Sequence, residues 1–443
     1  MSDKIKNRFF ILITLSVFSM VILSDFSPAL LHGGRFVAEE GCVFFEKAWY
    51  SSWYDALFYS FGGYINIVAN ASTLLARHLV PLAYAPYVTM SVALLFQLGA
   101  PFLLLTAKDA WLASPRVRLV AVALLLLVPQ SVEVSAQSLH SQFHLALCCG
   151  LILAFETCSG WREYLRLIML FLGPLSGPGA VSLGPLFVLR LLADRSRVRL
   201  VECLVIISAS AIQVLFFFGK FKTRTYNSNL YDCILAFFVR YFVYPFMGFK
   251  HFVNRLGQTL QAHELAGHPP YGFIVLTLAL MALVAGMFLY QAWYNKNTRE
   301  AAWLALAGAT HAFAAMYGAL NGAVTIIVPY FAERYVFVGQ SLLACSVLCL
   351  AVTGGQVVQR VCRVLVAVML LFGVYHYFKP FIFHPFMEGP SWRGEVARWG
   401  KDHSYGLRAW PAIGWLVYLD DTHTAEQRRK ACPVLPAPHE GAE

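Results

Sequence analysis

The feature that most constrains this chain is a series of separate long apolar runs joined by short segments rich in lysine and arginine. The first run ends at about Ser24. The chain has 443 residues, of which 58% are hydrophobic and only 13% are charged, whereas a soluble domain is about half apolar and a quarter charged. A water-soluble fold would expose large apolar patches. The sequence therefore predicts an integral membrane protein.

The apolar runs predict an all-α polytopic membrane protein with about eleven transmembrane helices. Each short loop on the predicted inner side is basic, and this pattern orients membrane proteins. The N-terminus is predicted inside and the C-terminus outside, with the first span retained. We assign the net charge of +10 to these loops and not to nucleic-acid binding.

The predicted transmembrane domain covers residues 1–378, and residues 379–443 form a short polar tail on the outer side. Long external loops are expected at about 25–87 and 220–271. The first contains weakly amphipathic, aromatic-rich stretches that suit the headgroup region, and the second contains a surface helix around 230–246. Three cysteines fall on the predicted outer side, where disulfides are permitted. The sequence leaves open which of them pair, if any do: Cys42, Cys233 and Cys432.

Two adjacent carboxylates, Glu39 and Glu40, follow the first apolar run on the predicted outer side. A carboxylate at an interface can accept the proton of an attacking hydroxyl. Neighbouring helical residues diverge by about 100°, so one acid would be catalytic while the other positions a hydroxyl or pairs with Arg35. The alternative is a solvated acid pair that starts a helix.

A polar cluster follows the third predicted span, on the same side as Glu39. Two of its histidines are four residues apart and would bind a metal if a third ligand arrived, but we favour an interfacial turn over a metal site. Contacts with a sugar or a phosphate are the other interpretation. The cluster comprises Glu133, Gln137, His140, Gln142 and His144.

Residues 173–179 contain three glycines and two prolines, which do not continue a helix easily. Irregular backbone at membrane depth is tolerated where it is buried in protein or lines a wet cavity. The stretch is therefore either irregular backbone that is buried in protein or lines such a cavity, or a tight outer turn.

Basic residues on the predicted outer side suit an anionic partner, because they depart from the positive-inside pattern. Lys220, Lys222 and Arg224 would contact a lipid-linked phosphate or ordinary anionic lipid. Arg334 would clamp a phosphate with two hydrogen bonds or pair locally with Glu333.

The order and spacing of several short motifs, across nearly the whole chain, resemble the polytopic GT-C glycosyltransferases, which use polyprenyl-phosphate sugars. Bacterial GT-C-like membrane proteins are the nearer resemblance, and pilin-glycosylating arabinofuranosyltransferases are one candidate type. The motifs are Ala38-Glu39-Glu40-Gly41, Gly62-Gly63-Tyr64, Pro129 to Glu133, Leu175-Ser176-Gly177-Pro178, Glu333-Arg334-Tyr335 and Gly389-Pro390-Ser391-Trp392.

The resemblance implies an inverting transferase in the bacterial cytoplasmic membrane that needs no metal or other cofactor. Its partners would be a polyprenyl-phosphate-linked sugar donor, a glycan or protein acceptor, and membrane lipid. Glu39 would be the base, or Glu40, because many members carry Asp at the first position. The leaving phosphate would contact Arg334 with Lys220, Lys222 or Arg224, and the expected substrate-binding residues are Gln137, His140, His144, Tyr64 and Trp392.

Other functions for such a chain are a transporter or flippase of a lipid-linked or small solute, and an oligosaccharide polymerase or ligase with a lipid-diphosphate donor. A structural partner in envelope synthesis is a further alternative. Transporters usually carry ionisable residues near the membrane midplane and often show repeated halves. Here the polar groups gather at one predicted outer face, which favours surface chemistry.

Overall fold

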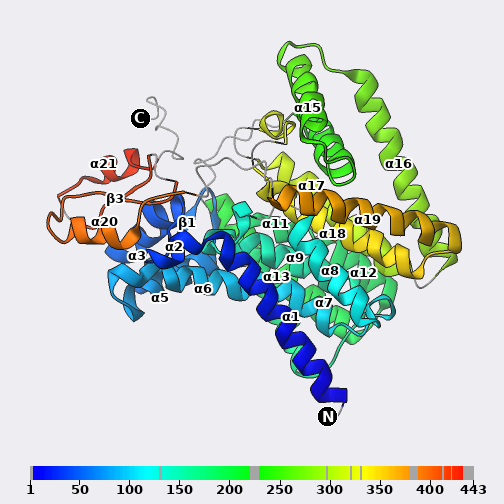
Figure 1. The fold of residues 1–443 in the computed structure, drawn as a ribbon, viewed down its shortest axis with the longest axis horizontal. Coiled ribbons are helices and arrows are strands. Elements are labelled where there is room, and N and C mark those ends of the chain that lie inside the picture. Colours follow the sequence, from blue (N-terminus) through cyan, green and yellow to red (C-terminus); the bar gives the residue numbers. More distant parts are fainter. Residues whose placement is uncertain are drawn as a thin grey trace.

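The structure is a computed structural model that describes residues 3–128, 132–219, 229–295, 298–319, 322–329, 332–378, 388–411, 414–420 and 422–432. This part of the chain is mostly helical, and its strands form two short antiparallel hairpins (Figure 1). The hairpins pair β1 (Ser60–Phe61) with β2 (Tyr64–Ile65), and β3 (Leu407–Arg408) with β4 (Leu416–Val417).

The first half of the chain forms a small lobe and then the beginning of a helix bundle. Its helices are α1 (Asp3–Asp25), α2 (Ser27–Leu31), η1 (Glu40–Phe45), α3 (Glu46–Tyr50), α4 (Trp53–Leu57), α5 (Ile67–Leu79), η2 (Leu82–Tyr84), α6 (Ala85–Gln97), α7 (Gly99–Thr106), η3 (Ala110–Leu112), α8 (Pro115–Leu127), η4 (Val132–Val134), η5 (Ser138–His140), α9 (Ser141–Ala154), α10 (Trp161–Ser176), α11 (Pro178–Val181), α12 (Gly184–Asp194) and α13 (Arg197–Gly219).

The second half completes the bundle and ends in the tail. Its helices are α14 (Leu230–Phe237), η7 (Phe238–Val243), α15 (Lys250–Leu265), α16 (Tyr271–Tyr294), α17 (Arg299–Tyr317), η9 (Ala323–Ile326), α18 (Arg334–Thr353), α19 (Gln356–Phe378), α20 (Trp392–Trp399) and α21 (Ala425–Lys430).

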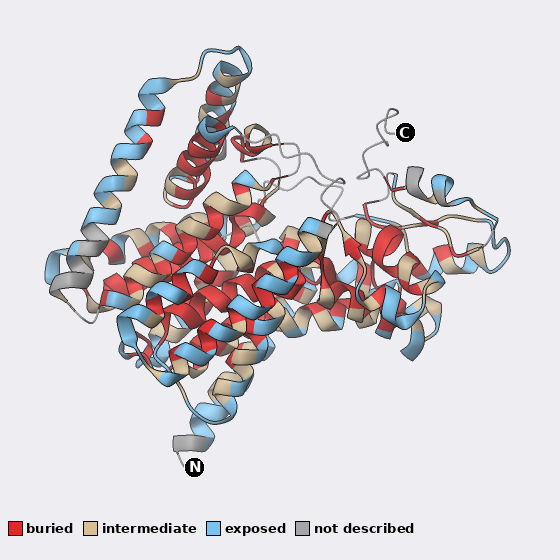
Figure 2. Cartoon of the chain, turned by 180° about the vertical axis from the view of Figure 1, so that it is seen from behind, coloured by how far each residue is buried: buried red, intermediate tan, exposed pale blue. Residues whose placement is uncertain are grey.

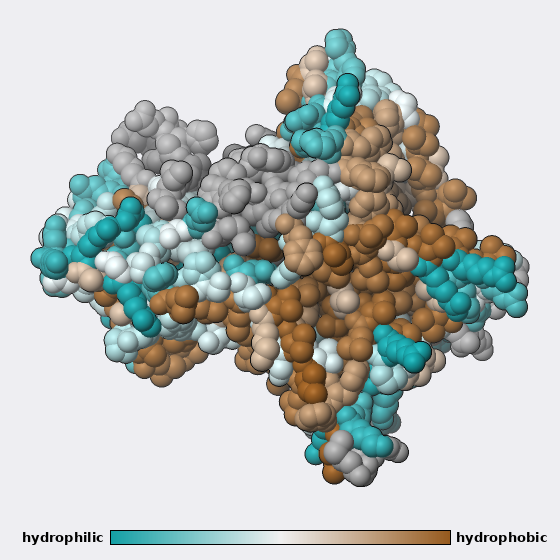
Figure 3. Space-filling model, viewed as in Figure 1, coloured by the Kyte–Doolittle hydropathy of each residue, from teal (hydrophilic) through white to brown (hydrophobic). Residues whose placement is uncertain are grey.

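Within the described residues, five helical segments are long and apolar enough to cross a membrane, and a sixth arises if one bent pair counts as a span. The structure therefore agrees with an all-α membrane protein. Brown, apolar surface covers much of the bundle in Figure 3, whereas the lobe that holds the tail is more polar. The five segments are Ile5–Asp25, Leu82–Thr106, Arg197–Phe218, Arg334–Thr353 and Gln356–Phe378.

The core of the bundle is built around α9 and α18, which other helices enclose (Figure 2). Every residue of α9 except Gln142 is buried. From Leu145 to Ala154 the sequence of α9 is continuously apolar and has no polar face, which is typical of a helix surrounded by protein. This central helix links the polar cluster at His140 to the opposite end of the bundle.

The bent pair forms at the interruption predicted within residues 173–179. α10 ends at Ser176, and the chain then turns by 116° into the segment that contains α11 and α12. A Cβ at Gly177 would lie 2.0 Å from Oε1 of Gln142, so the close approach of that side chain requires glycine. A Cβ at Gly179 would meet Nε2 of His311 at 2.7 Å. The break is therefore packed against protein.

The predicted surface helix around 230–246 does form a helix, as α14 and η7, but its surface position is wrong. Residues 232–241 are all buried. Phe237 stacks on Tyr241 with ring centroids 4.6 Å apart and also contacts Phe313 of α17. Its apolar side chains pack in the bundle, where they lose more contact with water than at an interface.

The C-terminal tail packs on the loop that follows α2, and together they form the lobe at one end of the bundle (Figure 1). Val37 forms a bridge with Trp410, and Phe36 packs edge-on against Trp392 at 4.9 Å. A disulfide joins Cys42 to Cys432. Of the three cysteines predicted on the outer side, Cys42 and Cys432 therefore pair, and Cys233 is a free, buried thiol.

We expect loss of the disulfide to loosen the tail, because the crosslink joins residues that are 390 apart in sequence. Removing a native disulfide typically costs about 2–5 kcal/mol. Cys42→Ser and Cys432→Ser should both expose the tail to protease in intact membranes, while Cys158→Ser, which changes a free cysteine, should not. Equal protection of all three variants would contradict this role.

The buried Glu46 should make tail docking depend on pH. Burial raises its pKa to about 7, against the backbone hydrogen bond from Tyr418 and the charge of Arg428. Because the unfolded carboxyl ionises at lower pH, stability should fall by on the order of 2 kcal/mol as pH rises from about 4.5 to 7. Glu46→Gln should flatten this slope in thermal unfolding. An unchanged slope would contradict the assignment.

Candidate functional site

The candidate site begins with residues 35–40, which follow α2 and lie between the bundle and the tail. The amide of Trp410 donates to the carbonyl of Phe36 at 2.9 Å, and the amide of Ala38 donates to the carbonyl of Trp410 at 2.6 Å. These bonds fix the backbone just before the two acids. Glu39 is therefore held in place by a residue some 370 positions later in the chain.

Glu40 is fully enclosed and its carboxylate is used within the fold. Oε1 accepts hydrogen bonds from the amide and hydroxyl of Ser138 at 2.8 and 2.5 Å, and Oε2 accepts from the amide of Val37 at 3.4 Å. Burial raises the pKa of Glu40, and the bonds from Ser138 and Val37 and the charge of Arg35 oppose that rise. This environment suits a carboxyl that joins two segments.

Glu39 differs from Glu40 because its side chain is only half buried. It precedes η1 in helical geometry. It also interacts electrostatically with Arg334, from the start of α18. The structure thus separates the two acids as expected from their spacing: one faces inward, and the other lies at the edge of the polar cluster.

An ion pair between Glu133 and Arg334 joins η4 to α18. Nη1 of Arg334 contacts Oε1 of Glu133, and the amide of Arg334 donates to Oε2 at 3.0 Å. Burial opposes ionisation of Glu133, but Arg334 and the neighbouring His140 outweigh it and lower its pKa. Arg334 thus pairs with an acid 201 residues away, in addition to any contact with its neighbour Glu333.

The two guanidinium groups of the site differ in access. The Arg334 side chain is 26% exposed, so part of it can reach a ligand. Arg35 is 2% exposed; its Nη2 donates to the carbonyl of Ser135 at 3.1 Å, and its guanidinium lies 3.8 Å from the centroid of the Phe26 ring. Arg35 therefore acts inside the fold, and Arg334 is the better candidate for binding an anion.

The histidines and glutamine of the predicted cluster are buried and bonded to the backbone. Nδ1 of His140 donates to the carbonyl of Glu133 at 2.8 Å, and Nε2 of His144 donates to the carbonyl of Val134 at 3.0 Å. Gln137 donates to the carbonyl of Val37 at 3.4 Å. These side chains brace the 132–140 segment, so their direct contact with a substrate stays a prediction. Among the described residues, no group of three His, Cys, Asp or Glu side chains has the arrangement of a metal site.

The remaining predicted residues are Trp392, Tyr64 and three basic residues. Trp392 is 2% exposed, and its Nε1 donates to the carbonyl of Leu82 at 2.8 Å, so its ring packs in the lobe and does not offer a face to a sugar. Tyr64 follows a turn at Gly62 and Gly63, whose φ angles of 62° and 86° favour glycine. Three predicted phosphate contacts lie outside the described residues: Lys220, Lys222 and Arg224.

Two features of the site were not predicted. Glu133 was recognised only as a neighbour of the histidines, although it is the partner of Arg334. Arg240, predicted to lie on a surface helix, is fully buried and donates through Nη1 to the carbonyl of Val328 at 3.0 Å. The available signal was the rarity of charged residues in apolar surroundings, since each buried charge requires a partner.

Comparison of the chain with protein-family models and with curated proteins finds no match. The candidate site is therefore identified from its geometry alone. It combines a half-buried carboxylate, Glu39, with a partly exposed guanidinium, Arg334, beside a buried polar network.

The Glu133–Arg334 pair should be energetically coupled. Breaking a buried ion pair typically costs about 3 kcal/mol or more, because one charge is left without its partner. Glu133→Gln and Arg334→Gln should each lower the thermal unfolding temperature of the purified protein, and the double variant should lose less than the sum. Arg360→Gln, which removes an exposed arginine near the start of α19, should have little effect. Strict additivity would show that the two residues act independently.

Proposed function

We propose that the protein is an inverting glycosyltransferase that moves a sugar from a polyprenyl-phosphate-linked donor to a hydroxyl of a glycan or protein. The observation that carries the proposal is the presence of two different groups in one site: the charge of the half-buried Glu39 interacts with that of Arg334, which is partly exposed. Transfer to a hydroxyl needs a proton acceptor and a cation for the leaving phosphate, and this cluster contains both types of group.

In the proposed reaction, the acceptor oxygen attacks the anomeric carbon as the bond from that carbon to the phosphate oxygen breaks. Glu39 takes the proton of the acceptor hydroxyl. The leaving polyprenyl phosphate keeps the bonding electrons, and Arg334 stabilises its negative charge, an electrostatic contribution that is usually large. Glu40 acts as a positioning residue, because its bonds to Ser138 and Val37 hold the backbone beside Glu39.

The membrane arrangement supports a donor that enters from lipid. We propose that about eleven helical segments cross the cytoplasmic membrane of a bacterium, counting the shorter apolar helices Ser138–Ala154 and Tyr271–Gly286 and the bent pair among them. The N-terminus would lie inside and the tail outside. Exposed aromatic residues in the first loop suit the headgroup region, namely Trp53, Tyr54 and Phe58.

Glu39→Gln should reduce transfer by about 10²- to 10⁴-fold, the usual contribution of a general base. The measurement is a mass spectrum of surface glycans and glycoproteins from cells that carry the gene, lack it, or express a variant. One sugar residue should be missing without the gene and in Glu39→Gln. Cells that express Asp55→Asn, which changes an exposed acid in the same loop, should carry the sugar residue as wild-type cells do.

A fully active Glu39→Gln/Glu40→Gln double variant with normal expression would overturn the proposal. Membrane vesicles separate transfer from transport. If wild-type vesicles move a labelled lipid-linked sugar across the membrane and form no new glycosidic bond, the protein is a transporter or flippase. A requirement for a lipid-diphosphate donor would instead identify a polymerase or ligase.

A further inference from the structure

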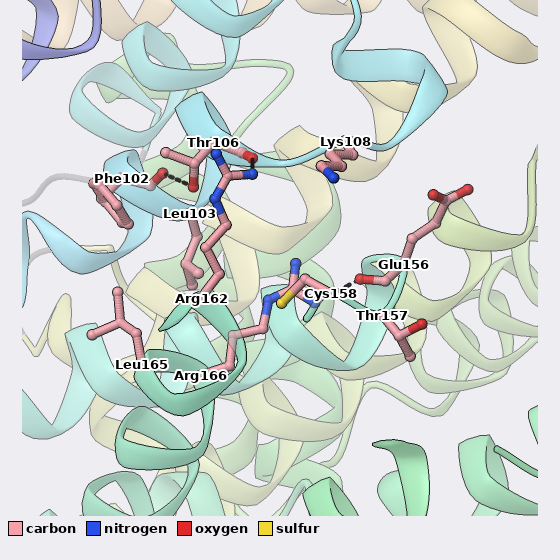
Figure 4. Close-up of a pocket in the computed structure, with 10 residues that line it drawn as sticks. All are labelled: Phe102, Leu103, Thr106, Lys108, Glu156, Thr157, Cys158, Arg162, Leu165 and Arg166. Atoms are coloured by element: carbon pink, nitrogen blue, oxygen red, sulfur yellow. Dashed lines mark hydrogen bonds between the residues drawn. The ribbon is translucent and has the colours of Figure 1, made fainter. Parts of the chain in front are cut away.

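A second polar site lies at the other end of α9, in a pocket between the end of α7 and the start of α10 (Figure 4). The candidate site contains His140, just before α9 begins, whereas Glu156 of this pocket follows just after α9 ends. A helix of 14 residues is about 21 Å long, so the two sites are well separated. The proposed transfer reaction makes no use of this pocket.

Basic side chains dominate the pocket lining. The lining contains three basic residues, Lys108, Arg162 and Arg166, and one acid, Glu156. Arg166 is buried and donates through Nη1 to the carbonyl of Glu156 at 2.6 Å, so it belongs to the wall. Lys108 is exposed and Arg162 is half buried, and in Figure 4 the Arg162 guanidinium reaches toward the loop that carries Lys108. These two cations are the accessible ones, and Nη1 of Arg162 donates to the carbonyl of Thr106 at 3.0 Å, which holds its guanidinium at the pocket.

An exposed apolar strip runs from the pocket along α10. Trp161 begins it and contacts Phe102 of the pocket wall, with ring centroids 6.0 Å apart. The next members of the strip are Tyr164, Ile168 and Phe171, and all four side chains are at least 43% exposed. Their spacing of three, four and three residues places them on one face of the helix. The strip therefore extends about 15 Å from the pocket.

We propose that this pocket binds the phosphate headgroup of an anionic phospholipid, whose acyl chain lies along the exposed face of α10. Lys108 and Arg162 attract the phosphate and donate hydrogen bonds to its oxygens. Trp161 lies where an amphipathic ring suits the boundary between headgroup and acyl chain. The apolar strip favours a lipid over free phosphate, because a small anion gains nothing from it.

Lipid binding to the full-length purified protein tests the proposal. Dioleoyl phosphatidylglycerol is titrated into delipidated protein in neutral detergent, and bound lipid is counted by native mass spectrometry. Lys108→Gln/Arg162→Gln should weaken binding by about tenfold to thirtyfold, from the loss of two cations near the phosphate. Lys108→Gln alone changes an exposed side chain and should not disturb folding. This variant should weaken binding of the phosphatidylglycerol about fivefold.

Arg116→Gln/Arg197→Gln is the matched control, because it removes two exposed arginines from the starts of α8 and α13, outside the pocket. It should bind the lipid as the wild type does. Equal losses in the control and pocket variants would overturn the proposal, and so would equal binding of dioleoyl phosphatidylcholine. Displacement of the phosphatidylglycerol by millimolar inorganic phosphate would also overturn it, because the site would then recognise a free anion.

Discussion

The structure depends on how an apolar helix bundle accommodates buried carboxylates. A buried charge is costly unless hydrogen bonds or an opposite charge satisfy it. Glu40 is satisfied by Ser138, and Glu133 is satisfied by Arg334, so the 132–140 segment is joined both to the start of the first loop and to α18. The tail then covers this junction through backbone bonds between Trp410 and the 36–38 segment.

This arrangement gives the two neighbouring acids different environments. Glu40 is buried and hydrogen-bonded to Ser138, and these contacts hold the backbone beside Glu39, which is half buried. The two arginine side chains differ in the same way: Arg35 is enclosed against Phe26, whereas Arg334 is partly exposed. In such a site, enclosed residues hold the accessible groups in place. Charges that are already fixed in position can stabilise a developing charge without first reorganising.

The sequence allowed part of the site to be predicted. Charge placement along the apolar runs put Glu39, His140 and Arg334 on one side, and the structure brings them into one cluster. The partner of Arg334 was missed, because local spacing favoured Glu333, and Glu133, although placed in the polar cluster, is 201 residues away in sequence. The surface position of 230–246 was wrong for a related reason: aromatic side chains suit both an interface and a protein core, and only neighbouring helices distinguish them.

The sequence by itself determined the helical character, the membrane setting and the presence of paired acids beside the first apolar run. Those properties follow from composition and local spacing, which act over a few turns of helix. Only the tertiary structure decided that Cys42 pairs with Cys432, that the tail encloses the first loop, and which acid stays accessible. The physical reason is that burial and ion pairing join residues hundreds of positions apart, and no local pattern encodes such contacts.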